Sequence, residues 1–153
     1  MRQRESQKSY RPKIAIRLFS GLINLSHKIN FSEELFKTKA IDIGDRLMPA
    51  IEKSKSSVPF SDVDLRSHQA QVPSWGSSSS TSEVTTIQME FGALSYLTGN
   101  QRYDDAVYKV SKHISGLTEG KKDGLVPLWI DPHSGKFGKR GSETYTMGAR
   151  TDR

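Results

Sequence analysis

The stretch that decides how this chain folds is TSEVTTIQMEF, residues 81–91, whose composition and spacing predict a helix. It places Glu83 and Glu90 seven residues apart, which is two helical turns, so both carboxylates project from one face. The same face carries Ile87 and Leu94, which are core residues by type. Carboxylates on a partly apolar face are costly unless something binds them, which favours a binding site; a solvated helix face is the alternative.

Signals at both ends set the limits of this helix at about 81–98. Ser80 and Glu83 fit a capping box at the start, and Gly99 fits a C-terminal stop. The next helix is predicted at 101–117, with Asn100 as its N-cap. Its expected buried face consists of Tyr103, Val107, Val110 and Ile114.

Two more helices are predicted upstream from the same apolar spacing. The first covers 14–29, with the apolar positions Ile14, Leu18, Leu22, Leu25 and Ile29. The second covers about 31–51, where Asn30 and Glu33 fit a capping box. Its expected buried stripe is Leu35, Ala40, Ile43, Leu47 and Ile51.

The rest of the chain predicts a long loop and one small β-hairpin. Residues 52–80 are rich in serine, so we expect an irregular connection, with Trp75 packed at its edge. Residues 125–130 predict a strand, 131–135 a turn and 136–137 the start of a return strand. The predicted fold is therefore mainly α: αα-hairpins joined by a long loop, with a β-hairpin near 125–137.

Composition limits the possible classes of protein. The chain has 153 residues, a net charge of +6 and no cysteine, which excludes disulfides and thiol chemistry. No apolar run approaches the length of a membrane span, and no secretory signal is visible. Residues 1–13 are predicted to be a basic disordered arm, although such an arm also fits binding to nucleic acid or an anionic membrane.

Four blocks of sequence, in order, resemble one known family. They are residues 40–50 (AIDIGDRLMPA), 83–99 (EVTTIQMEF followed by LSYLTG), 123–137 (DGLVP followed by SGKF) and 147–152 (MGARTD). Together they resemble the class I α-1,2-mannosidases, glycoside hydrolase family 47, of the endoplasmic-reticulum type. The resemblance covers residues of about 14–152, so we expect 14–153 to be part of a catalytic domain of this kind.

The resemblance implies a barrel of αα-hairpins that removes terminal α-1,2-linked mannose from high-mannose N-glycans in the endoplasmic reticulum or Golgi. It also implies Ca²⁺, inversion at the anomeric carbon and a membrane-anchored parent protein. Inversion requires a carboxylic acid on one side of the glycosidic bond and a carboxylate that activates water on the other. Calcium prefers oxygen ligands and can hold sugar hydroxyls.

The resemblance also assigns individual residues. Glu83 and Glu90 match carboxylates that line the sugar pocket, and Arg17 matches an arginine near the catalytic acid. Asp152 matches a candidate acid/base carboxylate, and Arg150 an arginine that contacts glycan branches in the endoplasmic-reticulum type. No metal ligand is expected within this chain, because the family's calcium-binding threonine lies in a later segment.

One position departs from the family. The resemblance places the catalytic-acid glutamate at Lys13, and a lysine does not replace a neutral carboxylic acid as proton donor. We therefore expect a partial chain that is inactive alone. The first alternative is a mannose-glycan binder without turnover on the same scaffold. The second is a helical interaction module or a basic nucleic-acid binder, and salt-sensitive binding to RNA or DNA would favour this second alternative.

Overall fold

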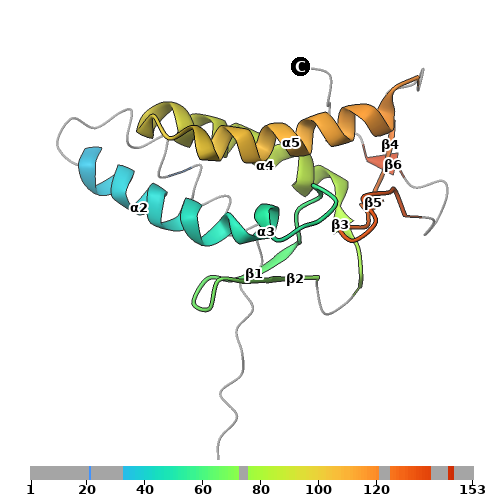
Figure 1. Ribbon diagram of the computed structural model, residues 1–153, viewed down its shortest axis with the longest axis horizontal. Helices are drawn as coiled ribbons and strands as arrows, with labels where there is room; N and C mark the ends of the chain where they lie inside the picture. Colours follow the sequence, from blue (N-terminus) through green and yellow to red (C-terminus); the bar gives the residue numbers. More distant parts are fainter. Residues whose placement is uncertain (1–20, 22–32, 73–75, 121–124, 139–144, 147–153) are drawn as a thin grey trace, which may run out of the picture.

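The computed structural model describes residue 21 and residues 33–72, 76–120, 125–138 and 145–146 (Figure 1). This part of the chain is mainly helical, with three small antiparallel sheets of two strands each. The predicted arm 1–13 and nearly all of the predicted helix 14–29 lie outside the described residues, as does Trp75. The expected mainly α architecture with helix pairs is thus confirmed, while its place in an (α/α) barrel remains an expectation from the family.

Helices α4 (Thr81–Thr98) and α5 (Gln101–Thr118) form the predicted αα-hairpin and pack along their length. They are joined by Gly99 and Asn100. Gly99 has φ = 70°, which favours glycine, and its N–H donates to the Ser95 carbonyl to end α4. Asn100 caps α5 as predicted, because its Oδ1 accepts from the Arg102 N–H at 3.1 Å.

The predicted helix 31–51 is two helices, α2 (Glu33–Leu47) and α3 (Pro49–Glu52). The break falls at Met48, because Pro49 has no N–H to continue the ladder and instead begins the next helix. Four expected stripe positions are buried or pack against the core, but Leu35 is 58% exposed and that prediction is wrong. The predicted N-cap Asn30 lies outside the described residues.

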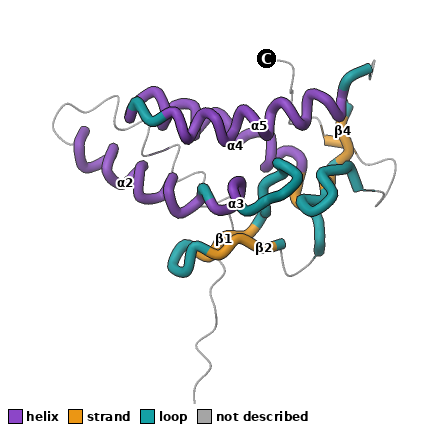
Figure 2. The backbone as a smooth tube through the Cα atoms, in the orientation of Figure 1, coloured by secondary structure: helices purple, strands orange, loops and turns teal. Residues whose placement is uncertain are grey.

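Residues 52–80 are not wholly irregular, which corrects the prediction. Strands β1 (Asp62–Asp64) and β2 (Gln69–Gln71) form an antiparallel hairpin in which Val63 pairs with Ala70. Helix α3 lies between this hairpin and the α4–α5 pair (Figure 2). Val58 and Val63 are buried, so this connection contributes to the core.

The predicted hairpin near 125–137 is present. Strands β4 (Val126–Pro127) and β5 (Trp129–Ile130) lead into a turn in which the Gly135 N–H donates to the Asp131 carbonyl, and Ile130 then bridges Phe137. The main partners of these strands lie elsewhere: β5 pairs with β3 (Ser79–Ser80) and β4 with β6 (Tyr145–Thr146).

One hydrophobic core joins these elements. Its largest fully buried side chains come from both long helices, α2, the hairpins and the loops between them, and they include Tyr103, Phe91, Leu47, Met48, Leu94, Ile114 and Ile130. The rings of Phe91 and Tyr103 pack between α4 and α5 with centroids 5.9 Å apart. Among the described residues, no helix is long and apolar enough to cross a membrane.

Candidate functional site

The start of α4 is held by tertiary contacts. Ser80 occupies the N-cap position, but its side chain makes no capping hydrogen bond, so the predicted capping box is wrong. Instead Thr81, which is 0% exposed, donates its N–H to the Leu128 carbonyl at 3.0 Å and its hydroxyl to the Pro127 carbonyl at 2.7 Å. The first turn of α4 is therefore fixed to the strand segment 126–130.

Glu83 lies in this fixed turn, on the helix that the sequence predicted. A carboxylate in the first turn is stabilised by the positive end of the helix dipole. Glu83 borders a small cavity of about 20 Å³. The other side chains around this cavity are Leu47, Ala50, Pro59, Phe60, Ser61, Val63, Ser79, Val84 and Ile87.

Glu90 lies two turns further along α4, where it is half-buried and its Oε2 atom is buried. Ile87 and Leu94, which were expected on the same face, are 6% and 0% exposed and belong to the core. The predicted combination of carboxylates with core residues on one helix is therefore present. Both glutamates interact with other groups of the chain.

The remaining predicted site residues, Arg17, Arg150 and Asp152, lie outside the described residues. The backbone nevertheless links the strand that precedes Arg150 and Asp152 in the sequence to the start of α4. Strand β5 pairs with β3 directly before α4, and β4 pairs with β6, which precedes Arg150 and Asp152 in the sequence. The segment 126–130 is thus the structural bridge between the first turn of α4 and β6.

The described residues do not fit the calcium ion that the family implies. Calcium takes six to eight oxygen ligands, mostly carboxylates and carbonyls. In the described ranges no group of three or more histidine, aspartate or glutamate side chains lies close enough to hold a metal ion. We therefore assign no calcium ligand to these residues.

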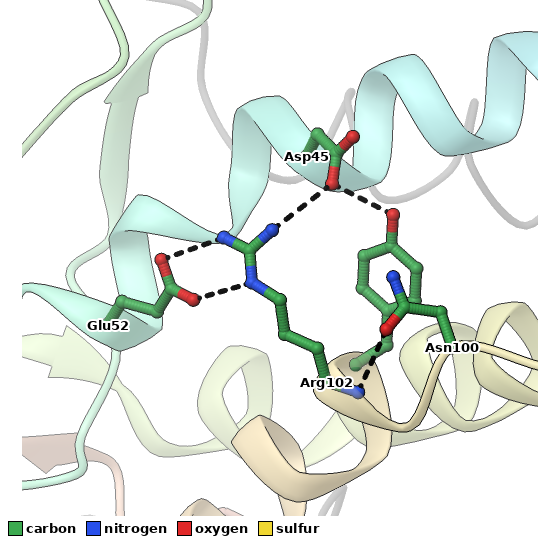
Figure 3. Close-up of polar contacts among 5 residues, drawn as sticks. Asp45, Glu52, Asn100 and Arg102 are labelled. Atoms are coloured by element: carbon green, nitrogen blue, oxygen red, sulfur yellow. Dashed lines mark hydrogen bonds and ion pairs between the residues drawn. The ribbon is translucent and has the colours of Figure 1, made fainter.

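A polar cluster that sequence reasoning missed ties α5 to α2 and α3 (Figure 3). The Arg102 guanidinium donates to both oxygens of Glu52, at 2.9 and 3.1 Å, and lies 3.7 Å from Asp45. The Tyr103 hydroxyl donates to the same Asp45 oxygen at 2.8 Å. Hydrogen bonding to Glu52 raises the pKa of Arg102, while burial and the hydrogen bond to Asp45 raise the pKa of Tyr103 to about 12.

The turn at 131–135 is fixed to the end of α5 by His113. Its Nε2 lies 2.7 Å from the Gly135 carbonyl oxygen, and Gly135 has φ = 69°. A Cβ atom at position 135 would lie 2.8 Å from the same imidazole nitrogen, so both backbone conformation and space require glycine. The contact is structural, and no sequence motif had singled out His113 for it.

Comparison with known proteins identifies the class of this domain. The sequence pattern of glycosyl hydrolase family 47 matches residues 11–153. The chain is 47% identical over 137 residues to the endoplasmic reticulum mannosyl-oligosaccharide 1,2-alpha-mannosidase of Homo sapiens. That alignment covers 90% of this chain and 19% of the human protein.

Two further relatives give the same result. The mannosidase of the same description from Saccharomyces cerevisiae is 40% identical, over 90% of this chain and 26% of the yeast protein. Mannosyl-oligosaccharide 1,2-alpha-mannosidase IB of Mus musculus is 32% identical, over 83% of this chain and 19% of its own length. The chain belongs to glycosyl hydrolase family 47, and it spans about a fifth to a quarter of the length of these relatives.

Proposed function

We propose that the protein is part of the machinery that removes terminal α-1,2-linked mannose from high-mannose N-glycans by inverting hydrolysis in the endoplasmic reticulum, with this chain binding the glycan but inactive alone because Lys13 stands at the position of the catalytic acid. The observation that carries this proposal is the match of residues 11–153 to a family of glycosidases. Glu83 and Glu90, which the resemblance assigns to the sugar pocket, both lie on α4. Identity is higher to the two relatives described as endoplasmic-reticulum enzymes, at 47% and 40%, than to the IB enzyme, at 32%. This difference supports the choice of compartment.

In this proposal Glu83 and Glu90 form one wall of the sugar pocket. Carboxylates accept hydrogen bonds from sugar hydroxyls, and bonds to a charged group are stronger than those between neutral groups. Arg17 and Arg150 would add donors to the glycan, and Asp152 would act as an acid or base.

The proposal is tested by titrating the chain with α-1,2-mannobiose and following binding by calorimetry. Glu83→Gln and Glu90→Gln keep the shape of the side chain but remove its charge, so each is expected to weaken binding by about tenfold. Glu52→Gln is the matched control, because Glu52 lies on α3, outside α4, and pairs with Arg102. Equal effects of the three variants would contradict the assignment.

A second candidate, a glycan binder without turnover, is favoured by Lys13. The resemblance places this lysine where the family has its catalytic-acid glutamate, and lysine is a poor donor for this step. Binding of mannobiose without release of mannose would support the binder. Release of mannose by the wild-type chain would exclude it, and hydrolysis gained only by Lys13→Glu would identify the lysine as the cause.

A further inference from the structure

Ser61, at the edge of the cavity beside Glu83, has an unusual environment. It is 7% exposed, and within the described part of the chain its hydroxyl oxygen has no hydrogen-bond partner. A buried hydroxyl that forms no hydrogen bond costs roughly 1–3 kcal/mol, so such groups usually have a bound water or a ligand as partner.

The cavity is large enough for one water molecule and too small for a sugar ring. Its volume is about 20 Å³, and roughly 10–15 Å³ on this scale suffices for a water. Buried waters usually make about three hydrogen bonds. Three oxygen-bearing side chains border the cavity, namely Ser61, Ser79 and Glu83.

These three side chains offer complementary hydrogen-bonding roles. The Ser61 hydroxyl can donate to a water, and the Glu83 carboxylate can accept from it. Ser79 donates its own proton to the Pro59 carbonyl at 2.8 Å, which leaves lone pairs on its oxygen to accept from the same water. The other side chains around the cavity are mainly apolar, so these three oxygens are the polar groups that a water there would meet.

We propose that this cavity is an internal water site that links Ser61 and Ser79 to the Glu83 carboxylate. Ser61 then acts through the water as a positioning residue, holding Glu83 in one orientation toward the pocket. The positioning role rests on the proposed function, because it assumes that Glu83 contacts the sugar. The water site itself does not depend on that assumption.

The sign of the change in melting temperature in Ser61→Ala tests the water site. If the water links Ser61 to Glu83, the substitution removes a satisfied hydrogen bond and lowers Tm by about 3 °C. If the hydroxyl is unpaired, its removal leaves Tm unchanged or raises it, which overturns the proposal. Ser95→Ala is the matched control, because Ser95 is 8% exposed and donates to the Asn100 carbonyl, far along α4.

A double-mutant cycle shows whether Ser61 and Glu83 act together. Ser61→Ala, Glu83→Gln and the double variant are compared by urea unfolding. A shared water makes the effects non-additive, whereas Ser95→Ala and Glu83→Gln should add. Additive effects of Ser61→Ala and Glu83→Gln would overturn the link.

Direct detection gives an independent answer. In the wild-type chain, NMR should detect transfer of magnetisation (a nuclear Overhauser effect) from water protons to the methyl groups of Val63 or Ile87, as expected for a long-lived water in the cavity. The signal should disappear in Ser61→Ala and persist in Ser95→Ala. No signal in the wild type would contradict the proposal.

The mannobiose titration separates this inference from the proposed function. Ser61→Ala is expected to weaken binding by about fivefold, and Ser61→Thr, which keeps the hydroxyl, should restore most of the loss. If the wild-type chain binds no mannobiose, the proposed function fails while the melting, cycle and NMR results still decide the water site. If binding occurs and Ser61→Ala leaves it unchanged, Ser61 has no positioning role.

Discussion

Helices α4 and α5 have the same length and pack against each other, but they begin in different ways. Asn100 caps α5 with its own side chain, two residues from the N–H that it accepts. The first residue of α4, Thr81, instead bonds to Pro127, which lies 46 residues away. The cap of α5 is therefore local, while the side chains of Arg102 and Tyr103 in the same turn also bond to Glu52 and Asp45. The first residue of α4 has no such local cap and is held by the strand segment 126–130.

This difference explains why the candidate site lies on α4. A helix start that is fixed by distant strands places Glu83 relative to those strands, and so relative to β6. The hydrogen bonds from Thr81 to Pro127 and Leu128 thus fix the turn that carries Glu83.

The largest loss of stability is expected for a substitution at the contact between α4 and α5. Phe91→Ala removes a fully buried ring that packs on Tyr103, and should lower the free energy of unfolding by about 4 kcal/mol. Tyr96→Ala, on the same helix but 84% exposed, should change it by less than about 0.5 kcal/mol. Urea denaturation followed by circular dichroism gives both values. Similar losses in the two variants would mean that α4 does not pack through Phe91.

Thr81→Val tests the hydrogen bond that holds the start of α4 to Pro127, because valine has nearly the same shape as threonine but no hydroxyl. It removes the donor to the buried Pro127 contact and should cost about 2 kcal/mol. Hydrogen exchange should accelerate both in the first turn of α4 and in residues 125–130. Thr86→Val is the control, because this hydroxyl belongs to an exposed residue and, among the described residues, bonds within α4 to the Ser82 and Glu83 carbonyls. If hydrogen exchange in Thr81→Val becomes faster only in α4, the start of α4 is not coupled to residues 125–130.

The same difference explains how much of the fold the sequence predicts. Helix α5 could be predicted with its cap and its buried face, because both signals lie within the helix or next to it. The β1–β2 hairpin could not, because β1 has only three residues, with the single apolar residue Val63 between two aspartates, which is too short for alternation to predict a strand. Leu35 follows the helical spacing, but at its place on α2 nothing in the described part of the chain covers it.

The candidate site could be predicted only in part. The helical spacing of Glu83 and Glu90 comes from the sequence alone, while their link to sugars came from the family resemblance. Ser61 and Thr81 could not be found in this way, because each is one of many serines and threonines. Their importance comes from partners and cavities that exist only in the folded chain.

Raising the pH tests the contact between Tyr103 on α5 and Asp45 on α2. Burial and the Asp45 hydrogen bond favour the neutral phenol and raise its pKa to about 12, above the unfolded value of 10.0. Its contribution to stability is complete below pH 10 and is lost as pH rises from 10 to 12. Tyr103→Phe should cost about 1.5 kcal/mol at neutral pH and reduce the alkaline loss.

Stability measured by urea unfolding from pH 7 to pH 12 tests this expectation. Tyr108→Phe is the control, because Tyr108 is 64% exposed on the same helix and should leave the alkaline loss as in the wild type. An identical pH profile for Tyr103→Phe and the wild type would show that Tyr103 is not the group responsible.

Asn100→Ala is expected to have the smallest effect and completes the comparison with Thr81→Val. Loss of the side-chain acceptor leaves the Arg102 N–H without its cap and should cost about 1 kcal/mol. Because this contact is local, faster hydrogen exchange should be confined to the first turn of α5 and should not reach residues 125–130. Asn100→Asp, which retains the acceptor and adds a charge favoured by the helix dipole, should restore stability. Faster exchange in residues 125–130 of Asn100→Ala would mean that the cap of α5 is coupled to the same strands as the start of α4, and that the two helix starts do not differ in kind.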